Sequence, residues 1–107
     1  MTTFDKREEA FEKKFAIDEE LKFKAVARRN RLLGLWAAEK IGLAGAEADS
    51  YARQVVAAEF DEGGNAAVVA KMLGDFGAKG VNVNEEEIRA HMDQLMAQAV
   101  AQVKAGI

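Results

Sequence analysis

Apolar residues recur at helical spacing along most of the chain beyond residue 18. The pattern predicts one helix from Asp18 or Glu19 to Leu43, a second over Ala46–Phe60, a third over Asn65–Ala78, and a fourth that opens at Asn84 and continues past Val103. Turns that contain glycine separate these segments, and no proline interrupts them. The sequence therefore predicts an all-α protein, a four-helix bundle over residues 18–107.

Two of these helices carry further signals. The first has apolar lines on opposite sides between Arg31 and Leu43, so we expect this stretch to be enclosed and to form the centre of the fold. The fourth has Asn84 as a cap with Glu87 three residues later, which is the pattern of a capping box. The short alternating run over 81–84 is read as a loop.

The segment before the first helix is densely charged and carries three phenylalanines. Phe4, Phe11 and Phe15 lie within about 20° of one line when each residue advances 100° around a helix. Cationic residues lie on one side of this Phe stripe and anionic residues on the other. The cationic flank is Arg7 and Lys14, and the anionic flank is Asp5, Glu8 and Glu12. A partner could therefore recognise both the apolar face of this segment and the direction in which it runs.

The same segment is expected to be flexible or only nascently helical when it is alone. Burying three Phe side chains yields about 5–9 kcal/mol, whereas fixing some fourteen backbones costs roughly 1–2 kcal/mol each before helix hydrogen bonds offset part of it. Its stripe is also out of phase with the apolar line of the following helix. We therefore divide the chain into an N-terminal segment, 1–17, that folds on a partner and a bundle, 18–107. The alternative is that the segment docks on its own bundle.

Composition narrows the classes of function. A chain of 107 residues suits a single domain, and without cysteine it has no disulfides or thiolate chemistry. Its start lacks the apolar run of a signal peptide, and no stretch approaches the roughly 20 apolar residues of a membrane span. The net charge of −3 argues against nucleic acid as the main partner. The acidic residues of the N-terminal segment disfavour insertion into an anionic membrane surface.

Catalytic and metal-binding patterns were sought, and none is expected. The single histidine, His91, lies at the border of an apolar face and has no cysteine or oriented hydroxyl beside it in the sequence. The acidic run Glu85–Glu87 falls in the first turn of the fourth helix, where carboxylates stabilise the positive end of the helix dipole. We expect no enzyme activity, no metal and no cofactor.

Arg28, Arg29 and Arg31 form the one notable basic cluster. Their side chains project in different directions around the helix, so some of them must lie beside its apolar lines. One interpretation is that they cover the edge of the core and pair with glutamates. A second is that they bind the phosphate of ATP or ADP, and a third is that they contact a partner protein.

Three stretches, Phe4–Phe15, Asp18–Phe23 and Ala27–Glu39, closely resemble the ζ-subunit family of alphaproteobacterial F-type ATP synthases. The resemblance implies a cytoplasmic, non-catalytic bundle whose segment from Phe4 to about Ile17 inhibits ATP hydrolysis. That segment would bind as a helix between the catalytic α and β subunits of the membrane-bound enzyme. Its implied partner-binding residues are Phe4, Arg7, Glu8, Phe11, Glu12, Lys14 and Phe15. A nucleotide-responsive bundle using Arg28, Arg29 or Arg31, or a general helical adaptor, are the alternatives.

Overall fold

The computed structural model describes residues 19–61 and 63–107. This part of the chain folds into four helices and contains no strand. They are α2 (Glu19–Lys40), α3 (Gly45–Glu59), α4 (Asn65–Ala78) and α5 (Glu85–Ala105). The predicted all-α fold is confirmed, with α4 at the predicted bounds and the run over 81–84 as a loop. None of the described helices is long and apolar enough to cross a membrane.

The first predicted helix ends earlier than expected, at Lys40 rather than Leu43. Gly42 has a φ of +84°, which an L side chain rarely adopts. The Gly42 N–H donates to the carbonyl of Glu39, and the Leu43 N–H donates to that of Ala38. This pair of bonds is a Schellman motif, and it satisfies the carbonyls that the helix end would leave free. The apolar pattern in the sequence extends to Leu43 because Ile41 and Leu43 pack against the core although they lie beyond the end of the helix.

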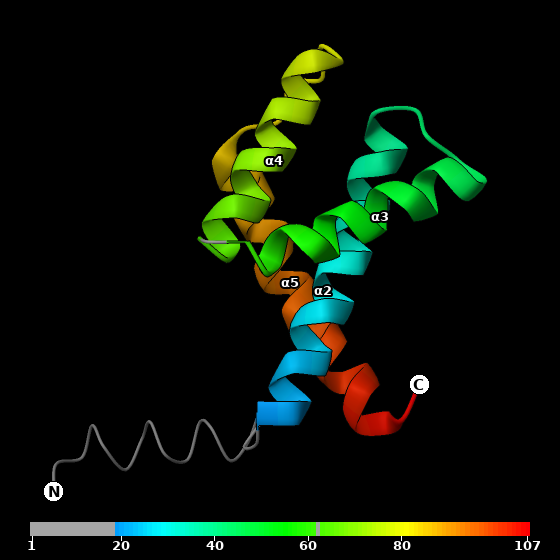
Figure 1. Cartoon of the computed structure of the whole chain (residues 1–107), viewed down its shortest axis with the longest axis vertical. Helices are drawn as coiled ribbons and strands as arrows, with labels where there is room; N and C mark the ends of the chain where they lie inside the picture. The colour runs from blue at the N-terminus through cyan, green and yellow to red at the C-terminus, as the bar shows by residue number, and fades with distance from the viewer. Residues whose placement is uncertain (1–18, 62) are drawn as a thin grey trace, which may run out of the picture.

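Helix α2 is the central element. It lies beside α5, which runs in the opposite direction, and α3 crosses it steeply, while α4 packs beside α5 (Figure 1). The crossing of α2 and α3 is close because Gly34 faces Ala52 there. The beginning of α2 and the C-terminus consequently lie at the same end of the molecule (Figure 1).

The core is built from all four helices and from Val83 in the loop before α5. Its largest fully buried apolar side chains are Phe76, Leu33, Met72, Ile88, Val55 and Val68. Trp36 is half-buried and packs edge-on against Phe76, with ring centroids 5.8 Å apart. The expectation that the later half of α2 is the centre of the fold agrees with the full burial of Leu33, Ala37 and Ala38.

Candidate functional site

The partner-binding residues expected in the N-terminal segment lie outside the described residues. These are Phe4, Arg7, Glu8, Phe11, Glu12, Lys14 and Phe15. The same holds for the expectation that the segment is flexible or nascently helical. The part of the candidate site that the structure describes is the body from which this segment leaves, beginning with the first turns of α2.

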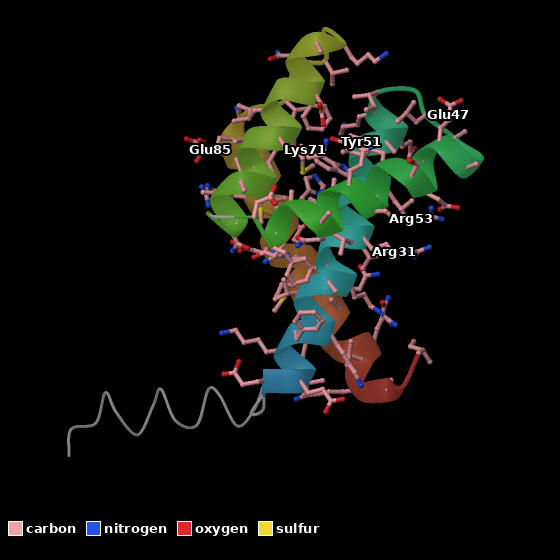
Figure 2. The ribbon with its side chains drawn as sticks, viewed as in Figure 1. Arg31, Glu47, Tyr51, Arg53, Lys71 and Glu85 are labelled. Carbon is pink, nitrogen blue, oxygen red and sulfur yellow. The ribbon has the colours of Figure 1, made fainter. Side chains whose placement is uncertain are left out.

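The basic cluster of α2 divides into three different environments. Arg29 points inward and is only 6% exposed. Arg28 is half-buried, and its Nη1 lies 3.4 Å from Oε1 of Gln102 on α5. Arg31 is exposed and points away from the bundle (Figure 2). The three residues therefore cannot act as one site.

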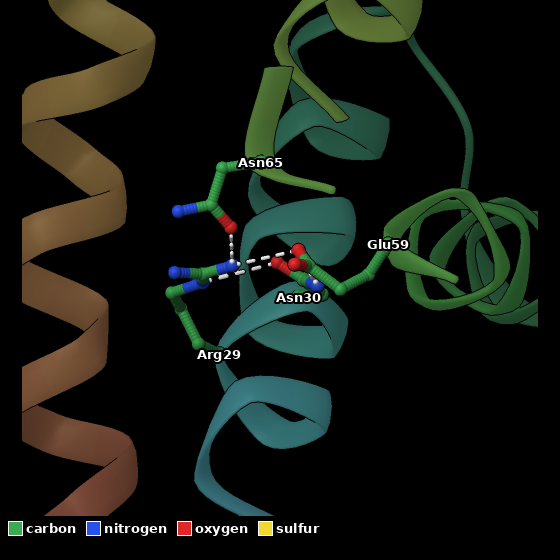
Figure 3. A network of polar contacts seen from close by, with 4 residues as sticks. All are labelled: Arg29, Asn30, Glu59 and Asn65. Carbon is green, nitrogen blue, oxygen red and sulfur yellow. Dashed lines mark hydrogen bonds and ion pairs between the residues drawn. The ribbon is translucent and has the colours of Figure 1, made fainter. Parts of the chain in front are cut away.

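Arg29 is the centre of a polar network that joins α2, α3 and α4 (Figure 3). Its Nη2 donates to Oε1 of Glu59 at 3.0 Å and to Oδ1 of Asn65 at 2.8 Å, and its Nε donates to Oδ1 of Asn30 at 3.0 Å. Asn30, which is fully buried, donates from Nδ2 to the same Glu59 oxygen at 3.0 Å. The network ties the middle of α2 to the end of α3 and the start of α4.

The charges of this network compensate one another. Burial lowers the pKa of the Arg29 guanidinium, while the nearby carboxylates of Glu59 and Asp93 act in the opposite direction. The group stays charged at neutral pH because an arginine pKa lies far above 7. Pairing of this cluster with a glutamate was one of the interpretations of the sequence, and Arg29 with Glu59 fulfils it. A nucleotide phosphate would have to be bound by Arg28 and Arg31, since Arg29 is occupied.

An apolar groove with a cationic rim lies at the end of the molecule where α2 begins. Residues of α2 form one side, Val56 of α3 and Val103 of α5 contribute to the others, and the C-terminal residue Ile107 closes it. Its complete lining is Phe23, Lys24, Ala27, Arg28, Arg31, Val56, Val103, Gly106 and Ile107. The groove has a volume of about 540 Å³, which lies within the range of binding pockets.

Exposed apolar side chains surround this groove. Phe23 is 57% exposed and Ile107 is 74% exposed. Phe60, just after α3, is 60% exposed and lies against Phe23 with ring centroids 5.4 Å apart. The sequence predicted Phe60 as the last residue of its helix, whereas α3 ends at Glu59 and Phe60 lies just beyond it at the surface.

Two further clusters lie at the other end of the body. Tyr51 donates its hydroxyl to Oδ2 of Asp75 at 2.7 Å, and Nζ of Lys71 donates to the same oxygen at 3.0 Å while lying over the Tyr51 ring. His91 is half-buried and stacks on Trp36, with ring centroids 4.1 Å apart. Both clusters join neighbouring helices, and neither places a base beside a nucleophile in a pocket.

Comparison with known proteins assigns the chain to a family. The family model described as ATPase inhibitor subunit zeta matches residues 1–102, and so spans both the N-terminal segment and the body. The chain belongs to this family. A solved structure, titled only as the solution NMR structure of the protein, is 47% identical, with a TM-score of 0.71 over 81% of this chain and 99% of that chain. None of the curated proteins matches the chain.

Membership of the zeta family confirms the resemblance on which the sequence was interpreted. It implies a regulatory, non-catalytic role at an ATP synthase. Sequence reasoning missed the groove, because its walls combine residues of α2 with Val56 of α3 and Val103 of α5, which lie far from α2 in the chain. One signal was available in the sequence. Phe23 lies between two lysines on the polar side of α2, and an exposed aromatic side chain at such a position can indicate a binding surface.

Proposed function

We propose that the chain inhibits ATP hydrolysis by an F-type ATP synthase through its N-terminal segment. The segment, from Phe4 to about Ile17, inserts as a helix at an interface between catalytic α and β subunits on the cytoplasmic side of the membrane. The body, residues 18–107, holds the segment and carries no chemistry. The observation that supports this most is the match to the ATPase inhibitor subunit zeta model, which includes the segment as well as the body.

The chemistry of the segment fits an interface that excludes water. Three Phe side chains on one face supply an apolar anchor, and aromatic residues of this kind dominate the energetics of protein interfaces. Arg7 and Lys14 on one flank and Glu8 and Glu12 on the other would fix the direction in which the helix enters. The polar network at Arg29 joins α2 to α3 and α4 in the body that carries the segment.

The deciding test is an ATP hydrolysis assay on a purified F-type catalytic head. The full chain should lower the rate, and the chain without residues 1–17 should leave it unchanged. The truncated chain keeps every buried core residue that the structure describes, since these lie between Ala25 and Val100. Equal inhibition by both forms would show that the segment is not the inhibitory element.

Substitutions within the segment test the stripe itself. Phe11→Ala should weaken inhibition by roughly 30-fold or more, as expected for an aromatic anchor at an interface. Lys13→Ala is the matched control, because Lys13 lies on the opposite side of the same helix, about 160° away. If both substitutions weaken inhibition equally, the segment does not bind through its Phe face.

The position of the segment on its target can be tested separately. The chain has no cysteine, so Ala10→Cys introduces a unique attachment point for a photoreactive cross-linker. Cross-linked products should contain α and β catalytic subunits. Products that contain only other subunits would exclude the α/β interface while leaving inhibition to be judged by the assay above.

A further inference from the structure

The groove at the start of α2 is lined by cationic side chains and by no acidic side chain. Lys24, Arg28 and Arg31 are the charged members of its lining, and the other members are apolar residues and one glycine. The described part of the chain as a whole carries slightly more acidic than basic residues. The positive charge of the groove is therefore a local feature of this surface and does not reflect the composition of the body.

The protein makes little use of these cations internally. Nη1 of Arg28 lies 3.4 Å from Oε1 of Gln102, which is long for a hydrogen bond, and Lys24 pairs with the exposed Glu20 at 3.2 Å. Within residues 19–61 and 63–107, no carboxylate forms an ion pair with Arg28 or Arg31. Cations without counter-charges beside an apolar surface favour a partner that brings acidic groups.

The spacing of the cations indicates the shape of that partner. Lys24, Arg28 and Arg31 are separated by four and then three residues, so they form one row about 10 Å long on α2. The apolar groove residues Phe23 and Ala27 lie beside this row. A helix with acidic residues at the same spacing carries a row of the same length, and apolar residues next to its acids would enter the groove. Amphipathic helices bind apolar grooves in this way.

The form of the surface distinguishes a helix from other occupants. The groove holds about 540 Å³, and the exposed rings of Phe23 and Phe60, 5.4 Å apart, extend the apolar surface beyond it. A flat membrane surface would touch the projecting rings without filling the groove. A small amphipathic anion would fill the groove and leave the rings in water. A helix can contact both, because its side chains project into the groove while its length covers the rings.

We infer that this groove is a docking surface for an acidic amphipathic helix on the catalytic head of the ATP synthase. The acidic side chains of that helix pair with Lys24, Arg28 and Arg31, and its apolar side chains pack on the groove. The identity of the partner rests on the proposed function. Residues 1–17 are joined directly to the start of the body in the sequence, so a target that binds them is held close to the groove. Two linked contacts with one target raise the affinity above that of either contact alone.

Charge reversal at Arg31 tests the groove, because Arg31 is exposed and no carboxylate of the described residues pairs with it. Binding of the full chain to a purified F-type catalytic head is measured by biolayer interferometry. Arg31→Glu should weaken binding about three- to tenfold at low ionic strength, and the difference should shrink in about 1 M salt. Lys22→Glu is the matched control: it makes the same change of charge at an exposed position of the same helix, about 180° away from Arg31. It should change the affinity less than twofold.

Cross-linking tests the chemistry of the partner. Because the chain has no cysteine, Ile107→Cys places a unique thiol for a photoreactive cross-linker at the groove, where Ile107 is 74% exposed. The cross-linked peptide of the catalytic head, identified by mass spectrometry, should contain at least two carboxylates within about eight residues, next to apolar residues. Lys79→Cys is the control, because the turn after α4 lies at the opposite end of the molecule (Figure 1). It should not label this peptide.

Three results would overturn the inference. Arg31→Glu and Lys22→Glu would weaken binding equally, or Ile107→Cys would cross-link to a segment without acidic residues. In the third, the chain would bind phosphatidylglycerol vesicles, and Arg31→Glu but not Lys22→Glu would abolish this binding, so that the groove would belong to a membrane contact.

The proposed function is judged separately by the rate of ATP hydrolysis. If Arg31→Glu alone weakens binding but the unchanged chain does not inhibit, the proposed function fails and the docking surface stands. If the chain inhibits and the two substitutions act alike, the reverse holds.

Discussion

Gly34 is the residue at which α2 and α3 come closest. A Cβ added there would lie 2.7 Å from Cα of Ala52, which is backbone and cannot turn aside. Gly34→Ala should therefore lower the free energy of unfolding by about 1–3 kcal/mol, through overpacking. Gly74→Ala is the matched control, because nothing lies within 4 Å of its added Cβ and alanine favours a helix, so it should raise stability by about 0.4–1 kcal/mol. Urea denaturation monitored by circular dichroism measures both, and a gain in stability in Gly34→Ala would contradict the close crossing.

Tyr51 makes the fold sensitive to alkaline pH. Burial raises the pKa of its phenol, and the hydrogen bond to Asp75 and the charge of that carboxylate raise it further. The folded state therefore holds the phenolic proton at a pH where the unfolded state, with a tyrosine pKa of about 10, has lost it. The contribution of this group is fully present below about pH 10 and is lost as the pH rises above that value.

Because Tyr51 is the chain's one tyrosine, phenolate absorbance reports this group directly. The absorbance midpoint should lie above pH 10 in the folded protein and return to about 10 in concentrated urea. Tyr51→Phe should remove the part of the alkaline loss of stability that belongs to this group. Asp75→Asn is the control for the cause: it should lower the midpoint without abolishing the shift, since burial remains. A folded-state midpoint at the urea value would refute the account.

At the level of elements, the helices were largely predictable from the sequence and the contacts between them were not. The capping box of Asn84 and Glu87 is present as predicted, and α4 begins and ends at the predicted residues, because local patterns determine such features. The network of Arg29 with Glu59 and Asn65 spans 30 and 36 residues of sequence. Periodicity shows that Arg29 lies beside an apolar line, but the identity of its partners depends on how the helices cross.

The same network provides a test of how the helices are held together. Glu59→Ala leaves the buried guanidinium of Arg29 without its counter-charge and should lower the free energy of unfolding by about 2–5 kcal/mol. Glu85→Ala is the control: its pair with Arg89 is half exposed and within one helix, so the loss should stay below about 1 kcal/mol. Chemical denaturation of both variants gives the comparison, and similar losses would show that the network contributes no more than a surface pair.

Over the whole molecule, the sequence indicated that the N-terminal segment and the body are different surfaces, but not that the body offers a groove beside the segment's origin. The groove exists because α2 and α5 run in opposite directions, which brings Val103 and Ile107 to the beginning of α2. The structure places Lys24, Arg28 and Arg31 beside Val103 and Ile107 on one surface, although these residues lie far apart in the chain.

The division of the chain at residue 17 leads to a final prediction about stability. The chain of residues 18–107 should form the four described helices and should unfold cooperatively, because the described core residues lie between Ala25 and Val100. Urea denaturation of the full chain and of this body, monitored by circular dichroism, tests this, and each should show a single transition. A body that does not fold would mean that residues 1–17 belong to the same cooperative unit.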